Sequence, residues 1–335
     1  MKSRVCSLIV LVLAGCAIDG PGDRRYLPAD ADVALLQSAG YAGHSSSEIV
    51  FEASVLVLNT FYEGFDNDYL GPADFQVSGP AGSYTVESVD AYDLPAPAAP
   101  SSTVFVIDQS GSYADTDPFN TRAQAINKFV HDVVSPNTLL IGASARQGSL
   151  SAEPLEVQGV QVTNGSNGDG NYIFELGHRT GGLNAILDGA DEALDLLIDN
   201  GDPVARKQLV LLVHGNDQSS GTSLGSVVQK AQHAGIAIHV IALGPAPDAG
   251  FFAQLAEDTG GMFAPCPTGK QMVKVFSELE RLINGPRFVY HLRVRFNPSQ
   301  GLVAPGTEWL FRIGISDEYL ERTYNDVPVK INIPA

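Results

Sequence analysis

The sequence predicts an α/β domain with a mostly parallel sheet, inserted into a β-sandwich that is built from the segments on either side of it. Strands and helices alternate between residues 103 and 285, and this alternation is typical of a parallel sheet flanked by helices. β-type segments separated by Gly- and Pro-containing turns occupy residues 47–93 and return at 286–335. Because each flank alone is too small for a stable core, we expect the two flanks to form one discontinuous sandwich.

The composition indicates a folded, acidic protein. The chain has 335 residues, of which 44% are hydrophobic and 17% charged, and its formal net charge is −18. These values suit two globular domains rather than a disordered chain. The acidity excludes nucleic acid as a favourable partner and would repel anionic lipid head groups, so any membrane attachment needs another source.

The first residues resemble the signal peptide of a bacterial lipoprotein. Lys2 and Arg4 precede an apolar stretch at 8–13, and small residues lead to a cysteine in Leu13-Ala-Gly-Cys16. This resemblance implies that residues 1–15 are cleaved and that Cys16 carries acyl chains such as palmitate, which anchor the protein to a membrane. The expected location is the bacterial cell envelope, at the outer membrane or cell surface rather than the inner membrane. The alternative is an ordinary secretory signal with a chance cysteine.

Cysteine usage leaves no intrachain disulfide in such a mature chain. Cys6 would leave with the signal and Cys16 would be acylated, which leaves Cys266. We expect Cys266 to be a packing residue rather than a nucleophile, because no histidine-bearing motif lies beside it.

Two segments of the chain are expected to connect rather than to pack. Residues 16–46, rich in Gly, Pro, Asp and Ser, are predicted to be a flexible tether, and residues 94–102 a Pro-rich linker. The strands of the sandwich are predicted at 49–58, 74–77, 84–89, 288–296, 309–315 and 327–333, and those of the α/β domain at 103–107, 138–141, 208–213 and 236–243.

Apolar stripes and capping residues predict the helices. Leucine, isoleucine and alanine recur at helical spacing from Leu183 to Ile198, which indicates a helix that faces the core. Asp117-Pro118 is a typical helix start, and Thr222 or Ser223 is expected to cap the helix that follows it. Thr268 is expected to cap the last helix, which Asn284-Gly-Pro ends.

Oxygen-bearing side chains follow the first strand of the α/β domain. Asp108, Ser110 and Ser112 occur in Asp108-Gln-Ser-Gly-Ser, directly after five apolar or β-branched residues that predict a buried strand. Open α/β sheets bind ligands at the carboxyl ends of their strands, and hard oxygen ligands suit Mg²⁺ or Mn²⁺. The alternative is a solvated turn in which Asp108 bonds local amides.

Several segments in this region resemble a von Willebrand factor A domain, which is a Rossmann-like α/β fold. The resemblance extends from about residue 103 to 285 and rests on the stretches 104–112, 178–188, 207–215, 235–244 and 255–261. It implies that Asp108, Ser110 and Ser112 begin a metal-ion-dependent adhesion site, a divalent-cation site that grips protein ligands. Thr180 matches the family's threonine. The implied partner is a protein that offers a carboxylate to the metal.

The chain departs from this family at one site position. The family usually has Thr-Asp-Gly after its central strand, whereas this chain has Val213-His-Gly, so His214 replaces the second carboxylate. Loss of one anionic ligand is expected to weaken binding of a hard cation. His214 can ligate a softer ion such as Zn²⁺ or Mn²⁺, or it can hydrogen-bond Asp108 in a metal-free site. Asp217 is a secondary candidate ligand, and Thr180 should bring His178 near the site.

Three functions are compatible with these features. The first is a lipid-anchored envelope protein that binds a protein partner in adhesion or assembly, without enzymatic activity. The second is a metal-independent interaction scaffold of the same fold. The third is a serine hydrolase, because Gly221-Thr-Ser223-Leu-Gly matches the spacing of a nucleophile elbow. A polar loop separates Val213 from this motif, whereas a nucleophile elbow turns directly from strand to helix, so the third function is disfavoured.

Overall fold

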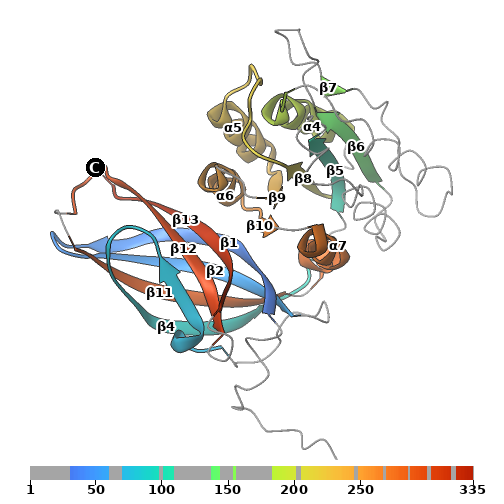
Figure 1. The fold of residues 1–335 in the computed structure, drawn as a ribbon. Helices are drawn as coiled ribbons and strands as arrows, with labels where there is room; N and C mark the ends of the chain where they lie inside the picture. Colours follow the sequence, from blue (N-terminus) through green and yellow to red (C-terminus); the bar gives the residue numbers. More distant parts are fainter. Residues whose placement is uncertain are drawn as a thin grey trace, which may run out of the picture.

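The protein consists of an α/β domain and a β-sandwich, as the computed structural model shows (Figure 1). The structure describes residues 31–59, 70–97, 101–108, 137–143, 154–155, 183–200, 205–244, 248–266, 269–285, 287–299, 303–317 and 322–334. None of the helices in these ranges is long and apolar enough to cross a membrane.

A ten-stranded sheet runs through both parts of the molecule. Its strand order is β4-β11-β2-β1-β10-β9-β8-β5-β6-β7. The first four strands are β4 (Gly82–Leu94), β11 (Arg287–Pro298), β2 (Ile49–Asn59) and β1 (Ala31–His44). The others are β10 (Phe263–Cys266), β9 (Ala237–Leu243), β8 (Arg206–Val213), β5 (Ser101–Asp108), β6 (Asn137–Ala143) and β7 (Pro154–Leu155). The strands from β10 to β6 are parallel, and the remaining pairs are antiparallel.

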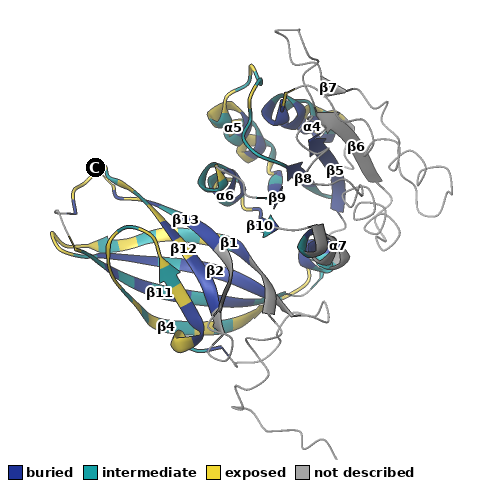
Figure 2. Ribbon diagram, viewed as in Figure 1, coloured by how far each residue is buried: buried dark blue, intermediate teal, exposed yellow. Residues whose placement is uncertain are grey.

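Helices cover both faces of the parallel part of the sheet. They are α4 (Ile186–Asn200), α5 (Leu224–Ala234), α6 (Ala249–Asp258) and α7 (Gly269–Asn284). Side chains of α4, α5 and α6 pack with Val104 and Leu211 on one face, whereas those of α7 pack with Phe105 and Val210 on the other. The central strands β5, β8 and β9 are therefore almost wholly buried (Figure 2). This confirms the predicted α/β class.

Local sequence explains where the helices begin and end. Ser223 is the N-cap of α5, and its hydroxyl accepts a hydrogen bond from the backbone N–H of Ser226 at 3.2 Å. Gly235 ends α5 in the left-handed conformation, with φ of 64°. The expected cap of α7, Thr268, and the expected helix start at Asp117 lie outside the described residues.

The sandwich is discontinuous in sequence, as predicted. Its second sheet has the order β13-β12-β3, with β3 (Phe75–Ser78), β12 (Glu308–Asp317) and β13 (Arg322–Asn332). A short 3-10 helix, η3 (Pro72–Asp74), precedes β3. Phe311 of β12 stacks on Phe51 of β2 with ring centroids 4.6 Å apart and meets Phe296 of β11 edge to face at 5.2 Å. The flanks thus bury one shared aromatic core.

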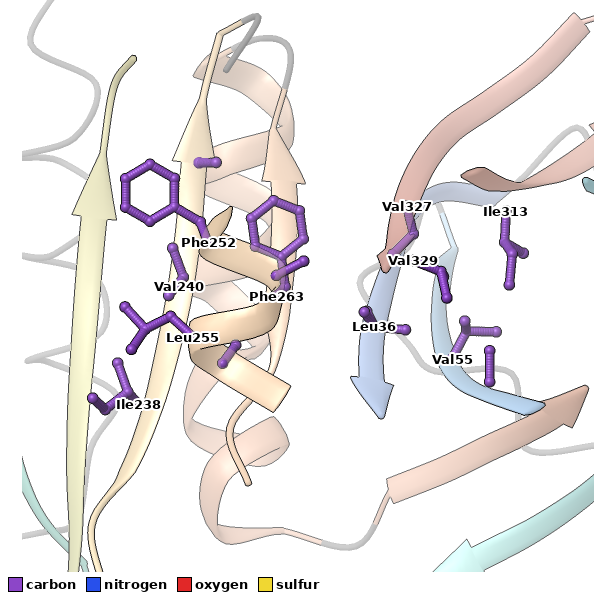
Figure 3. Packing of buried hydrophobic residues seen from close by; sticks show 14 of the residues in the cluster. Leu36, Val55, Ile238, Val240, Phe252, Leu255, Phe263, Ile313, Val327 and Val329 are labelled. Atoms are coloured by element: carbon purple, nitrogen blue, oxygen red, sulfur yellow. The ribbon is translucent and has the colours of Figure 1, made fainter. Parts of the chain in front are cut away.

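The apolar core is continuous between the two parts of the molecule. One cluster of buried residues includes Phe252 and Phe263 of the α/β domain together with Leu36, Val55 and Val329 of the sandwich (Figure 3). The bridge between them is β1, in which Leu36 lies opposite Phe263 of β10.

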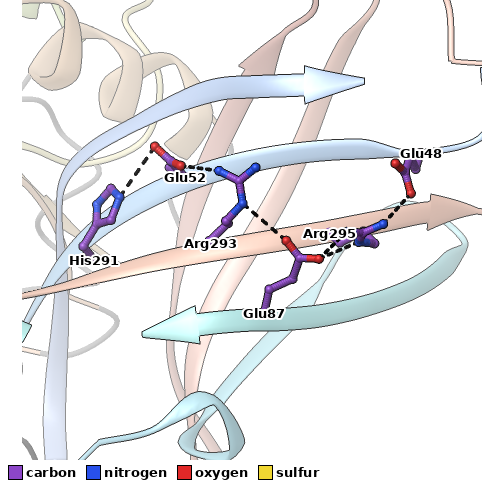
Figure 4. Close-up of polar contacts among 6 residues, drawn as sticks. All are labelled: Glu48, Glu52, Glu87, His291, Arg293 and Arg295. Carbon is purple, nitrogen blue, oxygen red and sulfur yellow. Dashed lines mark hydrogen bonds and ion pairs between the residues drawn. The ribbon is translucent and has the colours of Figure 1, made fainter. Parts of the chain in front are cut away.

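The outer face of the sandwich sheet is polar. Glu48, Glu52 and Glu87 alternate there with Arg293 and Arg295 in a network of ion pairs across β2, β11 and β4 (Figure 4). An antiparallel sheet that buries one face commonly exposes the other, and exposed pairs of this kind each contribute little to stability.

The prediction of a flexible tether at 16–46 is wrong from Ala31 onward, because β1 occupies residues 31–44. The segment 37–43 is rich in Ser, Ala and Gly and lacks alternating large apolar residues, so it carries no local strand signal. Its conformation is set by pairing along its whole length with β2. The short strand β10 was also not predicted.

Candidate functional site

Asp108 lies at the carboxyl edge of the parallel sheet, where the sequence predicted a site. It is the last residue of β5 and is fully buried. Its Oδ2 accepts hydrogen bonds from Asn184 Nδ2 at 2.8 Å and from the backbone N–H of His214 at 3.1 Å. A buried carboxylate requires such donors, because desolvation without them is costly. Asn184, which precedes α4, and His214, which follows β8, therefore hold Asp108 in a fixed position.

Asn184 is the site residue that sequence reasoning missed. It lies two residues before α4 begins, and its Nδ2 also approaches the backbone oxygen of His214 at 3.3 Å. Its own backbone oxygen accepts from the N–H groups of Gln218 and Ser219, at 2.9 Å and 3.0 Å, and from the Ser219 hydroxyl at 2.8 Å. These bonds tie the start of α4 to the loop between β8 and α5. The available signal was an asparagine just before a helix, which is typical of a cap.

The side chain of His214 lies toward the end of β9. A Cβ on Gly244, which follows β9, would be 3.2 Å from His214 Nε2. Gly244 has a φ of 78°, a conformation that favours glycine, so a side chain is disfavoured there and the imidazole has room. Asp108 therefore accepts a hydrogen bond from the backbone N–H of His214, whereas the His214 ring lies against Gly244 at the end of β9.

Asp217 is part of a hydrogen-bond network inside the β8–α5 loop. Its Oδ1 accepts from the Ser220 hydroxyl at 2.9 Å, and Ser220 Oγ accepts from the backbone N–H of Asp188 at 3.1 Å. The Asp188 carboxylate accepts from the backbone N–H groups of Gly221 and Thr222. Burial raises the pKa of Asp217, hydrogen bonds from the loop oppose the rise, and the charge of Asp188 adds to it.

The remaining predicted ligands, Ser110, Ser112 and Thr180, lie outside the described residues, as do His178 and Cys16. Within the described ranges, no group of three or more His, Cys, Asp or Glu side chains is arranged to hold a metal. Asn184 donates to Asp108 through its amide nitrogen, and its amide oxygen Oδ1 is buried and accepts no hydrogen bond from the residues that the structure describes. An amide oxygen is a hard ligand, so Asn184 Oδ1 is chemically suited to a divalent cation or to a water bound to one.

Ser223 acts as a helix cap in this structure rather than as part of a nucleophile elbow. Its hydroxyl accepts from Ser226 N–H and lies 2.9 Å from the Ser226 hydroxyl. The residue has extended backbone angles and follows the loop that begins after Val213. Cys266 is a buried free cysteine, and burial raises the pKa of its thiol, which disfavours a reactive thiolate.

The fold and the site define an α/β domain whose candidate site lies at the carboxyl ends of the strands. A family model for the von Willebrand factor type A domain matches residues 103–278, more than half of the chain. The chain belongs to this family, whose members commonly serve in protein interaction or adhesion. No curated protein matches the chain closely enough to count as a relative.

Solved structures of similar fold share little sequence with this chain. A von Willebrand factor type A protein from Catenulispora acidiphila has 12% identity and a TM-score of 0.44, over 91% of this chain and 74% of that one. The proximal thread matrix protein 1 of the mussel byssus, described with a zinc-occupied metal-ion-dependent adhesion site (MIDAS) motif, has 16% identity and a TM-score of 0.42. The match covers 61% of this chain and 50% of that one. The pilus adhesin SpaC of Lactobacillus rhamnosus GG has 11% identity and a TM-score of 0.41, and the match covers 87% of this chain and 47% of that one. This chain spans about half the length of the last two.

Proposed function

We propose that this protein binds another protein through the carboxyl edge of its parallel sheet and catalyses no reaction. The observation that carries the proposal is an exposed apolar side chain at this edge, directly before the residue that holds Asp108. Leu183, which directly precedes Asn184, is 51% exposed, whereas the aliphatic residues of α4 that face the sheet are buried. An exposed leucine at a fixed edge of the sheet offers a partner an apolar contact, and the buried core of a protein interface is more apolar than the rest of the protein surface.

The proposed anchor includes a divalent cation, Mg²⁺ or Mn²⁺. Asp108, Ser110, Ser112 and Thr180 would hold it, with a carboxylate of the partner completing the coordination. Asp108 is the anionic ligand that supports this most directly, since His214 replaces the second carboxylate and its ring lies at Gly244. We expect the cation to bind weakly, and we expect its affinity to rise when a carboxylate replaces His214.

The proposed location is the outer surface of a bacterial cell envelope, with acyl chains on Cys16 as the anchor. The support is the Leu-Ala-Gly-Cys pattern at 13–16 and an acidic chain that has no electrostatic attraction to anionic lipids. Metabolic labelling with a fatty-acid analogue should label the wild type and not Cys16→Ser. Equal labelling of both would contradict the anchor without affecting the binding proposal.

Calorimetric titration with Mn²⁺ and Mg²⁺ tests the cation. His214→Asp is expected to bind at least about tenfold more tightly than the wild type, because it returns a carboxylate to the edge of the site. Asp108→Ala is the matched variant that should bind more weakly than the wild type. Equal affinities for wild type and His214→Asp would contradict the claim that His214 weakens the site.

Capture of envelope proteins on the immobilised protein tests the interface. Leu183→Asp should lose the captured partner, whereas Ile198→Asp should retain it. Ile198 is a suitable control because it is also exposed, at 41%, but lies at the other end of α4. Loss of capture in both variants, or in neither, would refute binding at the Leu183 edge.

A metal-independent scaffold is the second candidate function. It is favoured by the two N–H donors that already satisfy Asp108 Oδ2, because the edge then keeps its shape without a cation. Capture that is unchanged by EDTA, yet abolished by Leu183→Asp, would support this candidate over the cation-dependent one.

A further inference from the structure

We propose that Asn184 is a positioning residue that compensates for the carboxylate that this chain lacks. Its amide nitrogen holds Asp108 in place, and its amide oxygen supplies a neutral oxygen toward the cation or a water bound to the cation. This inference rests on the proposed cation site and deepens it, because it explains how the site keeps its shape with one carboxylate fewer.

The first step of the argument is the contact between Asn184 and both strand ends. Nδ2 of Asn184 donates to Asp108 Oδ2 at 2.8 Å and approaches the backbone oxygen of His214 at 3.3 Å. One amide group therefore joins the end of β5 to the end of β8. A second carboxylate in its place would meet two oxygen acceptors at short range, so the amide is chemically matched to this position.

The second step is that Asn184 is itself immobilised. It is 1% exposed, and its backbone oxygen accepts three hydrogen bonds from Gln218 and Ser219. Its backbone N–H also approaches Gln218 Oε1 at 3.4 Å. A side chain held by its own backbone in this way can orient a neighbouring ligand, as the outer-shell partners of metal ligands do.

The third step concerns the amide oxygen. Asn184 Oδ1 is buried and, across the part of the chain that the structure describes, it accepts no hydrogen bond. The nitrogen and oxygen of an amide are roughly 2.2 Å apart, so Oδ1 lies within about 5 Å of Asp108 Oδ2. An orphaned buried oxygen is costly unless a cation, a water or another donor meets it. A divalent cation or its water beside Asp108 would satisfy this oxygen.

Charge explains why an amide rather than a carboxylate suits this chain. With Asp at position 184, two buried carboxylates would repel each other until a cation arrived. With Asn, the site is stable in either state, at the cost of cation affinity. Asn184 thus makes the edge tolerant of cation loss, which an aspartate would not.

The variants Asn184→Asp and Asn184→Ala test this inference in the full chain, with thermal unfolding in EDTA or Mn²⁺ and calorimetric titration with Mn²⁺. Asn184→Asp should unfold a few degrees below the wild type in EDTA, regain that loss in Mn²⁺, and bind Mn²⁺ at least about tenfold more tightly. Asn184→Ala removes the donor without adding charge, so it should be destabilised in both conditions and bind Mn²⁺ more weakly than the wild type. The manganese-dependent recovery is a readout that a merely structural asparagine would not produce.

The outcomes separate this inference from the proposed function. If His214→Asp binds Mn²⁺ tightly but Asn184→Asp shows no recovery, or stays unfolded at every Mn²⁺ concentration, the role of Asn184 is refuted and the cation site stands. If neither aspartate variant nor the wild type binds Mn²⁺, the cation site itself is refuted, and the inference falls with it.

Discussion

Replacing Glu257 with glutamine tests how the α/β domain is joined to the sandwich. Glu257 lies at the end of α6, and its Oε1 accepts a hydrogen bond from the backbone N–H of Ala39 in β1 at 3.1 Å. The contact lies just beyond the point where β1 pairs with β10 through Leu36 and Phe263. The carboxyl group therefore binds the sandwich strand where it leaves the α/β sheet.

Burial raises the pKa of Glu257 from its ordinary value of 4.5 to about 7, the hydrogen bond from Ala39 opposes the rise, and the charge of Asp258 adds to it. The folded protein thus keeps this proton at pH values where the unfolded chain has lost it. The stabilisation is complete below about pH 4.5 and is lost as the pH rises through about 7. The two pKa values correspond to about 3 kcal/mol, which partial exposure to solvent reduces to about 2 kcal/mol.

Glu257→Gln keeps an acceptor for Ala39 but cannot ionise. Urea unfolding should give the same free energy of unfolding for both proteins at about pH 4.5, whereas at about pH 8 the variant should be more stable by about 2 kcal/mol. Glu278→Gln, in α7, is the control for the loss of one negative charge. A difference between wild type and Glu257→Gln that does not change between these pH values would refute the reasoning, because stability would then not be linked to this proton.

Two further predictions concern packing. Phe311→Ala should lower the free energy of unfolding by about 3–5 kcal/mol in denaturant titrations, because Phe311 is fully buried between the two sheets. Leu310→Ala is the control and should lower it far less, because Leu310 is 43% exposed. Equal losses of stability in the two variants would contradict the sandwich core. Gly261→Ala should prevent folding as judged by circular dichroism, because its Cβ would lie 2.0 Å from the backbone oxygen of Ile238, whereas Gly221→Ala meets nothing within 4 Å and should fold normally.

The parts of the fold that the sequence predicted are those with strong local patterns. β5 and β8 were recognisable because runs of buried apolar residues are bounded by polar ones, and α5 because Ser223 caps an apolar stripe. β1 was missed because residues 37–43 have small side chains, and pairing with β2 decides their conformation. A strand whose conformation depends on pairing with a distant strand cannot be predicted from its local sequence pattern alone.

The candidate site shows the same division. Asp108 was found because it ends a strand signal, and the edge of the sheet follows from that position. Asn184 was missed because it reaches Asp108 from 76 residues away, and no spacing rule links the two positions. The position of the His214 ring also depended on a neighbour, Gly244, at the end of another strand. The sequence therefore placed Asp108 at the edge of the sheet, whereas its hydrogen-bond donors could be identified only from the fold.

The register of the sandwich explains how one chain forms both parts. Leu94, the last residue of β4, lies directly opposite Arg287, the first residue of β11, so the chain leaves and re-enters the sandwich at paired positions. An inserted domain whose two ends meet in this way adds little loop-closure cost to the host. Arg287 also donates to Gln37 Oε1 at 3.2 Å, which connects this exit point to β1. β1 in turn pairs with β10, so main-chain hydrogen bonds connect the α/β domain to the sandwich at a second place. Glu257 lies at this second connection, where it accepts the hydrogen bond from Ala39.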